Sequence, residues 1–144
     1  MKNEYYSIAY NDLLYLQATL HLPFYNNIAV NAQQVAEKVL KSVVEIVSPD
    51  AEGILKTHNL RGLYNEISKY LPTFELNQWK LSMLKDIYFD AKYPGDNFME
   101  IDQKTCDECL SIMYDTIEAV NQFRAQEGLD IFTFNKLYTF NAID

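Results

Sequence analysis

Three lysines in this sequence have the type and spacing needed to hold an anionic group. Lys38 and Lys41 are three residues apart in the segment QQVAEKVLK, so they share one face of the helix that its apolar spacing predicts. Lys92 lies near the end of a second helical segment, YFDAKYP, which stops at a proline. The three ammonium groups together could hold one phosphate. The plainer interpretation is a solvated charged face, with Glu37 about 100° away from Lys38 around the same helix.

A histidine and two tyrosines complete the candidate ligand-binding set. His58 lies at the start of a predicted helix, where the helix dipole disfavours the imidazolium and a neutral imidazole can hydrogen-bond to a ligand. A local packing role is the alternative for His58, and His21 is interpreted as an ordinary polar residue near a helix end. Two tyrosines flank Lys92 and could stack on a base. The candidate ligand-binding residues are Lys38, Lys41, His58, Tyr88, Lys92 and Tyr93.

The two cysteines, Cys106 and Cys109, form a C-x-x-C motif inside a predicted helix. A redox C-x-x-C normally opens a helix after a strand, and no strand is predicted before this one. A zinc site would need two further ligands, and the chain contains only two histidines. We therefore interpret both cysteines as buried structural thiols.

Three aspartates, Asp86, Asp90 and Asp96, cluster around the end of the helix that carries Lys92. Asp86 and Asp90 are four residues apart, which is the spacing of a carboxylate pair for a divalent cation, although a solvated edge explains them as well. The four scattered glycines cannot form a phosphate-binding loop. No catalytic residue, metal site or cofactor is assigned.

Apolar residues recur every three or four positions through nearly the whole chain, which is typical of amphipathic helices. Thr57 and Asp102 are suited to cap the starts of two helices, and Gly128 is suited to end the last one. A polar loop is expected over 50–56. The predicted helices cover about residues 4–21, 27–47, 57–71, 76–92 and 102–128.

The expected fold class is all-α, an up-and-down bundle of about five helices with an aromatic-rich C-terminal tail. The spacing places Ile8, Trp79 and Met83 on inward faces. We expect residues 1–128 to form the bundle. The tail, 129–144, carries several aromatic and aliphatic residues, so it is expected to pack on the bundle or on a dimer partner.

Composition restricts the classes of partner. The net charge of −8 argues against a surface that follows an extended nucleic acid, because that surface needs clustered Lys and Arg. A transmembrane helix needs about 20 apolar residues, and no apolar run in the sequence approaches this length. The first residues lack the apolar stretch of a secretion signal. A cytoplasmic protein without membrane contact is therefore expected.

Three segments in order resemble the HEPN domain family. The helix containing QQVAEKVLK resembles the family's QAAEKALKALL helix, and the next helix opens with Thr57-His58-Asn59-Leu60, which is similar to its TH-x-L. The segment YFDAKYP resembles its Y-x-x-ARYP, with Lys92 where the family often has Arg. The resemblance covers roughly 5–124 and leaves the tail outside.

The resemblance implies a helical homodimer associated with nucleotide binding, with small nucleotidyltransferase partners and with toxin–antitoxin systems. Many members are metal-independent RNases whose motif is an Arg followed a few residues later by a His. In this chain the only arginines are Arg61 and Arg124, and both histidines precede both of them. The expected imidazole for acid–base cleavage is therefore missing from its usual place.

Three functions remain open at this point. The first is a non-catalytic module that binds a nucleotide or a nucleotidyltransferase-type partner, as a homodimer. The second is an RNase with atypical residues, in which His58 is the base and Lys92 stabilises charge. The third is a structural dimer or adaptor whose aromatic tail forms the interface.

Overall fold

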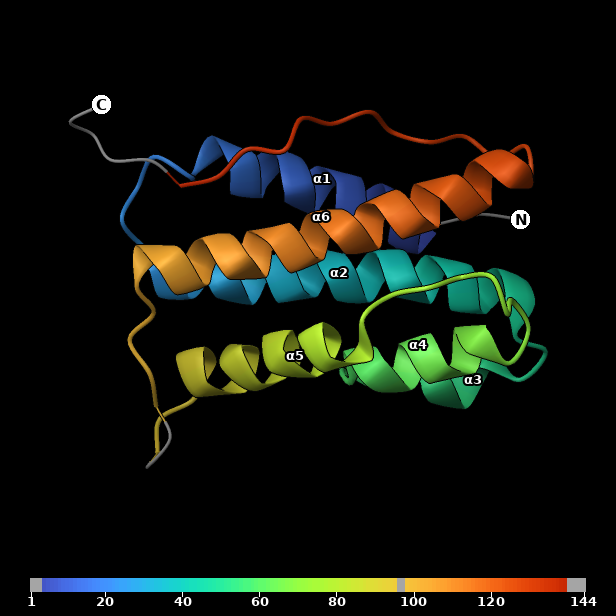
Figure 1. Ribbon diagram of the computed structural model, residues 1–144, viewed down its shortest axis with the longest axis horizontal. Coiled ribbons are helices and arrows are strands. Elements are labelled where there is room, and N and C mark those ends of the chain that lie inside the picture. The colour runs from blue at the N-terminus through green and yellow to red at the C-terminus, as the bar shows by residue number, and fades with distance from the viewer. Residues whose placement is uncertain (1–3, 96–97, 140–144) are drawn as a thin grey trace.

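The computed structural model of this protein describes residues 4–95 and 98–139. The described residues form helices and no strands, and the predicted all-α bundle is confirmed (Figure 1). Five of the helices have nine or more residues, and the short α3 has four. The helices are α1 (Glu4–Ala18), α2 (Tyr25–Val47), α3 (Ala51–Ile54), α4 (Leu60–Ser68), α5 (Gln78–Lys92) and α6 (Gln103–Gln126).

Helix α2 is the centre of the bundle and contacts α1, α4, α5 and α6. Figure 1 shows α1 and α6 above α2, and α4 and α5 below it. A helix surrounded in this way must be apolar around most of its circumference, and the α2 sequence meets that requirement. Its fully buried apolar residues are Ala29, Ala32, Val35, Ala36, Val39, Leu40, Val43 and Val44.

The helix boundaries differ in part from the predicted ones, since α1 ends at Ala18 and α4 at Ser68, before the expected ends near 21 and 71. The N-cap of α4 is Asn59, whose side-chain oxygen accepts a hydrogen bond from the Gly62 amide at 3.2 Å. Thr57 instead accepts a bond from the Asn59 amide at 3.1 Å, so it supports the cap and does not form it. The 50–56 segment, expected as a loop, contains α3.

Three residues that were expected to face inward are exposed. Ile8 is 46 %, Met83 37 % and Trp79 69 % accessible to solvent. The inward face of α5 is formed by other residues, among them Leu81 and Leu84, which are at most 1 % exposed. The Arg61 guanidinium lies over the Trp79 ring, 5.0 Å from its centroid.

The proposed cation pair on α5 gains no further ligand. Asp86 is largely exposed and lies 3.7 Å from the Lys85 ammonium. Asp96 lies outside the described residues. Across the described part of the chain, no group of three or more His, Cys, Asp and Glu side chains lies close enough to hold a metal ion. None of the helices in 4–95 and 98–139 has the length and hydropathy needed to span a bilayer.

The segment after α6 turns back and runs along α1 and α6 (Figure 1). Gly128 makes the turn with a φ of +69°, a conformation that favours glycine. Phe132 is 8 % exposed, and its ring stacks on Tyr10 with centroids 4.6 Å apart. The Phe134 ring stacks on Tyr114 at 5.7 Å. The described tail residues therefore contribute side chains to the bundle surface between α1 and α6.

The cysteine environment leads to a test of thiol reactivity. Cys106 and Cys109 are both 0 % exposed, and burial raises the pKa of each thiol to about 12. Because the thiolate is the reactive form, iodoacetamide at about pH 8 should leave the native protein unmodified. The same reagent in guanidinium chloride should add two adducts, as measured by intact mass. Modification of the native protein at the unfolded rate would contradict the burial.

Candidate functional site

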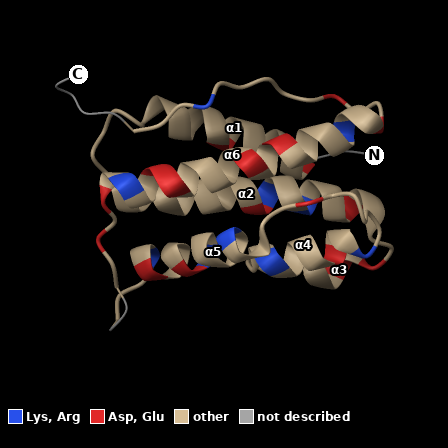
Figure 2. Ribbon diagram, in the orientation of Figure 1, with Lys and Arg blue, Asp and Glu red and all other residues tan. Residues whose placement is uncertain are grey.

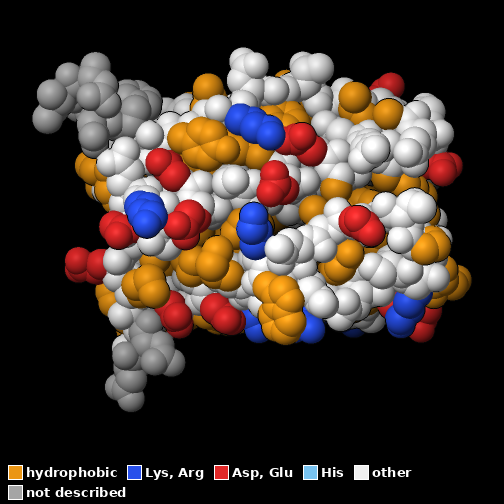
Figure 3. Space-filling view, in the orientation of Figure 1, with side chains coloured by type: hydrophobic (Ala, Val, Ile, Leu, Met, Phe, Trp, Pro, Cys, Tyr) orange, Lys and Arg blue, Asp and Glu red, His pale blue; other side chains and the backbone are white. Residues whose placement is uncertain are grey.

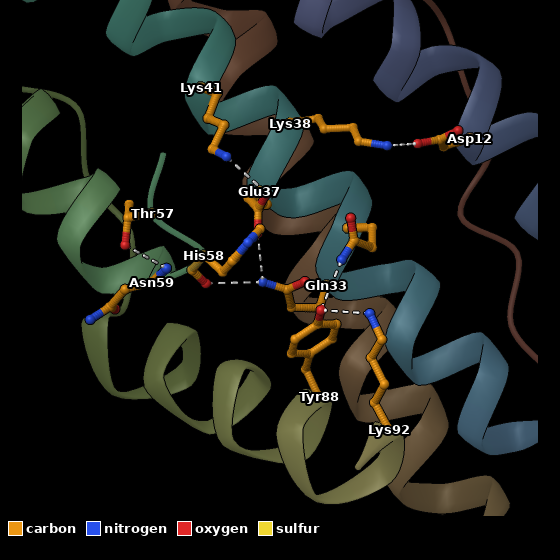
Figure 4. A network of polar contacts seen from close by, with 11 residues as sticks. Asp12, Gln33, Glu37, Lys38, Lys41, Thr57, His58, Asn59, Tyr88 and Lys92 are labelled. Carbon is orange, nitrogen blue, oxygen red and sulfur yellow. Dashed lines mark hydrogen bonds and ion pairs between the residues drawn. The ribbon is translucent and has the colours of Figure 1, made fainter. Parts of the chain in front are cut away.

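Two of the three candidate lysines pair with carboxylates. Lys38 forms an ion pair with Asp12 of α1, and their side chains are 26 % and 31 % exposed. Lys41 lies 3.0 Å from Glu37 Oε2, one helical turn away, and both side chains are almost completely buried. Figure 4 shows the Lys38 side chain directed toward α1 and the Lys41 side chain directed toward Glu37. The structure therefore does not bring these two ammonium groups together at one point.

Glu37 is the hub of a buried polar network. Its Oε2 accepts from Lys41, while its Oε1 lies 3.1 Å from His58 Nδ1 and 3.3 Å from Gln33 Nε2. The Glu37 side chain is 4 % exposed and the His58 side chain 61 %. His58 belongs to the connection between α3 and α4, so this contact joins that connection to the middle of α2 (Figure 4).

Gln33 ties the same connection to α2 a second time. Its Nε2 also donates to the His58 carbonyl at 3.3 Å, and Gln33 is 0 % exposed. Its Oε1 has no hydrogen-bond partner among the described residues. A buried acceptor of this kind costs on the order of 1–3 kcal/mol. Reversing the amide would place that oxygen against the Glu37 carboxylate, which is why the amide nitrogen faces Glu37.

The third lysine belongs to an aromatic cluster at the end of α5. Lys92 Nζ donates to Tyr88 Oη at 3.1 Å and lies 5.1 Å and 5.5 Å from the ring centroids of Tyr88 and Tyr93. The hydrogen bond to Tyr88 raises the pKa of Lys92. Gln34 of α2 donates to the same Tyr88 oxygen at 3.3 Å. Lys92 is therefore a cation surrounded by phenol rings. The charges of Lys38 and Lys41 are instead balanced by the carboxylates with which they pair.

The exposed part of this cluster is aromatic. Tyr93 is 47 % and Phe89 43 % exposed, and their rings stack with centroids 5.7 Å apart. Tyr88 is 3 % exposed and meets both rings edge-on. A planar ligand could stack on Tyr93 or Phe89 with its charged end at Lys92.

The residues that sequence reasoning left out of the site are Gln33, Gln34 and Glu37. Gln33, Glu37 and Lys41 are spaced by four, so they form one polar line among buried residues of α2 that are apolar apart from Ser42. That line was the available signal, because each of these side chains must find a partner when it is buried. The spacing does not show which partner, and His58 reaches Glu37 from 21 residues away.

The arrangement limits the chemistry of His58. With Nδ1 directed at Glu37, Nε2 is the ring nitrogen left for a ligand or for proton transfer. A carboxylate that holds one imidazole nitrogen fixes the ring orientation, as in the general-base pairs of hydrolases. Neighbouring Lys41 balances the Glu37 charge, so the buried pair is neutral overall.

The buried pair leads to a stability test. Glu37→Gln leaves the Lys41 ammonium buried without a carboxylate, so it should lower the free energy of unfolding by about 3–5 kcal/mol. The matched control is Asp12→Asn, which unpairs the partly exposed Lys38 and should cost about 0–1 kcal/mol. Both values come from urea unfolding followed by circular dichroism.

A third variant checks the cause of the loss. Adding Lys41→Met to Glu37→Gln removes the unpaired charge and should recover a large part of the lost stability. Equal losses for Glu37→Gln and Asp12→Asn would show that the buried pair has no special role.

Comparison with known proteins gives one match. The model of the HEPN domain family matches residues 3–123, which includes α1 to α5 and most of α6. The match covers the polar network and the α5 cluster, and it ends before the tail. Searches of curated proteins and of solved structures found no match. The chain belongs to the HEPN domain family.

Proposed function

We propose that this HEPN domain is a non-catalytic module that binds a nucleotide, and that it works as a homodimer beside a nucleotidyltransferase-type partner. The observation that carries the proposal is Lys92, a charged ammonium held between aromatic rings and without a carboxylate among its described contacts. The phosphate would lie at Lys92 and the base on the exposed Tyr93 ring.

The other candidate residues take different parts in this proposal. Tyr88 orients Lys92, and the exposed His58 offers Nε2 to a phosphate or ribose hydroxyl. Lys38 and Lys41 would act at longer range, because each already pairs with a carboxylate. Lys41 supports His58 through Glu37.

Charge favours a small ligand over an extended one. The chain has 20 acidic and 12 basic residues. Figure 2 shows Lys and Arg spread over separate elements and interspersed with Asp and Glu. Binding along a nucleic-acid strand needs a continuous basic surface. One phosphate group needs only a local cation, which Lys92 supplies.

Titration calorimetry tests whether a nucleotide binds and whether it binds at Lys92. ATP, GTP and AMP are titrated into the wild-type chain and into Lys92→Met, which should bind at least about tenfold more weakly because a charged hydrogen-bonded contact of 1.4 kcal/mol or more is lost. The matched control is Lys80→Met, an exposed lysine on the same helix and about 18 Å away along its axis. The absence of binding by the wild-type chain at millimolar nucleotide would contradict the proposal.

One contact favours a second candidate function, cleavage of RNA. The 3.1 Å contact between Glu37 and His58 gives the imidazole the orientation of a general base, although the chain lacks the usual Arg-to-His order. If this function holds, single-stranded RNA is cleaved by the wild-type chain and not by His58→Ala, and Glu37→Gln is slower. RNA that stays intact with equimolar wild-type protein removes this candidate.

A further inference from the structure

The described tail lies in a groove between α1 and α6, and almost all of its hydrogen bonds there are made by its main chain. We call this groove, lined by Tyr6 and Gln17 of α1 and by Asp107, Tyr114, Asn121 and Arg124 of α6, the tail groove. The tail has no helix or strand of its own over 129–139. The side chains of the groove therefore take the place of the main-chain partners that a neighbouring strand would supply.

The first half of the tail is held by three side chains. Arg124 Nε donates to the Asp130 carbonyl at 2.7 Å. The Phe132 amide donates to Tyr6 Oη at 2.8 Å, and the Phe132 carbonyl accepts from Asn121 Nδ2 at 3.1 Å. Both main-chain groups of Phe132 are therefore satisfied by the groove, one from α1 and one from α6.

The second half repeats this pattern. Gln17 Nε2 donates to the Asn135 carbonyl at 2.7 Å. Tyr114 Oη accepts from the Leu137 amide at 3.0 Å and donates to the Leu137 carbonyl. The Thr139 amide donates to Asp107 Oδ1 at 2.9 Å, and the Thr139 hydroxyl donates to the same oxygen at 2.6 Å.

Buried or partly buried aromatic side chains of the described tail are confined to two positions. Phe132 inserts between Tyr6 and Tyr10, and Phe134 packs on Tyr114. Tyr138 meets the Tyr114 ring edge-on, and Lys136 pairs with Glu118 at the surface. Ile131 and Leu137 are 46 % and 44 % exposed. Main-chain contacts hold an extended segment whatever its sequence, and inserted side chains provide the specificity. The groove therefore selects for aromatic residues two positions apart.

Contacts at the two ends of the groove set the register of the segment. At one end the Arg124 guanidinium binds a carbonyl, and at the other the Asp107 carboxylate binds an amide. Because every residue of an extended segment carries both kinds of group, these contacts determine which residues lie at the ends.

The tail is incompletely packed at both ends. A hollow of about 560 Å³ borders its start, between Tyr10, Arg124 and Ile131, and another of about 620 Å³ borders its end, between Asp107 and Tyr138. In Figure 3, hydrophobic side chains reach the surface over the upper edge, where the tail runs. Segments with exposed contacts and no regular structure are the ones that detach without global unfolding.

We propose that the tail groove is a binding site for an extended peptide with aromatic side chains at positions i and i+2, and that residues 129–139 occupy it as an intramolecular competitor. The partner is an extended segment of another protein with this pattern, bound in the register of the tail. The tail is the model for this ligand, because its main-chain hydrogen bonds and its two inserted phenylalanine rings show what the groove can bind. The proposal does not depend on nucleotide binding.

A labelled peptide with the sequence of residues 129–139 tests the proposal on the full chain. In the variant Phe132→Ala/Phe134→Ala the tail competes poorly, so fluorescence anisotropy should show peptide binding at least about tenfold tighter than to the wild-type chain, whose tail has an effective concentration in the millimolar range. The control peptide has alanine at both phenylalanine positions and should not bind. A cooperative thermal transition by circular dichroism shows that the variant is folded.

Each other outcome overturns the proposal. Lack of peptide binding by the folded variant would show that the groove accepts only its own tail. Binding of the variant to wild-type chains in light scattering, without peptide binding, would make the occupant the tail of a second copy. Native-state hydrogen exchange gives a measurement on the unchanged chain, in which the amides of Phe132, Leu137 and Thr139 should exchange faster than buried α6 amides. Equal protection in both sets would show that the tail does not detach.

Discussion

The rest of the structure depends on the burial of α2 on nearly every side. A central helix with four helical neighbours must be apolar on its buried faces, and the exceptions are the polar line of Gln33, Glu37 and Lys41 and the neighbouring Ser42. Each polar side chain in that line needs a partner once water is removed. Lys41 satisfies Glu37 within the helix, and His58 and Gln33 then fix the α3–α4 connection against its middle. The polar line thus sets where α4 begins.

The number and order of the long helices could be predicted from sequence, because the apolar spacing of α2 and α6 leaves little choice. The inward and outward faces of α5 could not be predicted from the sequence. Trp79 is large and apolar, so spacing places it inside, whereas the structure leaves it exposed beside Arg61 and fills the core with Leu81 and Leu84. The carboxylate partner of Lys38 could not be predicted either, since Asp12 lies on another helix, 26 residues away. Local pattern gives the period of a helix, and tertiary packing decides its neighbours.

The two surfaces for which binding is proposed lie in different layers of the bundle. On α1, Asp12 pairs with Lys38 of α2, while Tyr6 and Gln17 hold the tail. Tyr88 and Lys92 lie on α5 and Tyr93 directly follows it, on the opposite side of α2 from α1 (Figure 1). The same fold therefore presents a charged aromatic cluster at one layer and a main-chain-binding groove at the other. Both depend on tyrosine, whose ring packs while its hydroxyl donates or accepts.

The family match ends at residue 123, one position before Arg124, the first side chain to hold the tail. Apart from Arg124, the side chains that line the groove thus belong to the part of the chain that the family match covers, and the residues that occupy the groove lie beyond it. Without residues 129–139, the α1 and α6 surfaces of this chain would be uncovered, with the hydroxyls of Tyr6 and Tyr114 and their rings open to water. Those surfaces would then need another covering segment or a more polar sequence. The tail of this chain thus covers apolar and hydrogen-bonding surface that its own bundle leaves open.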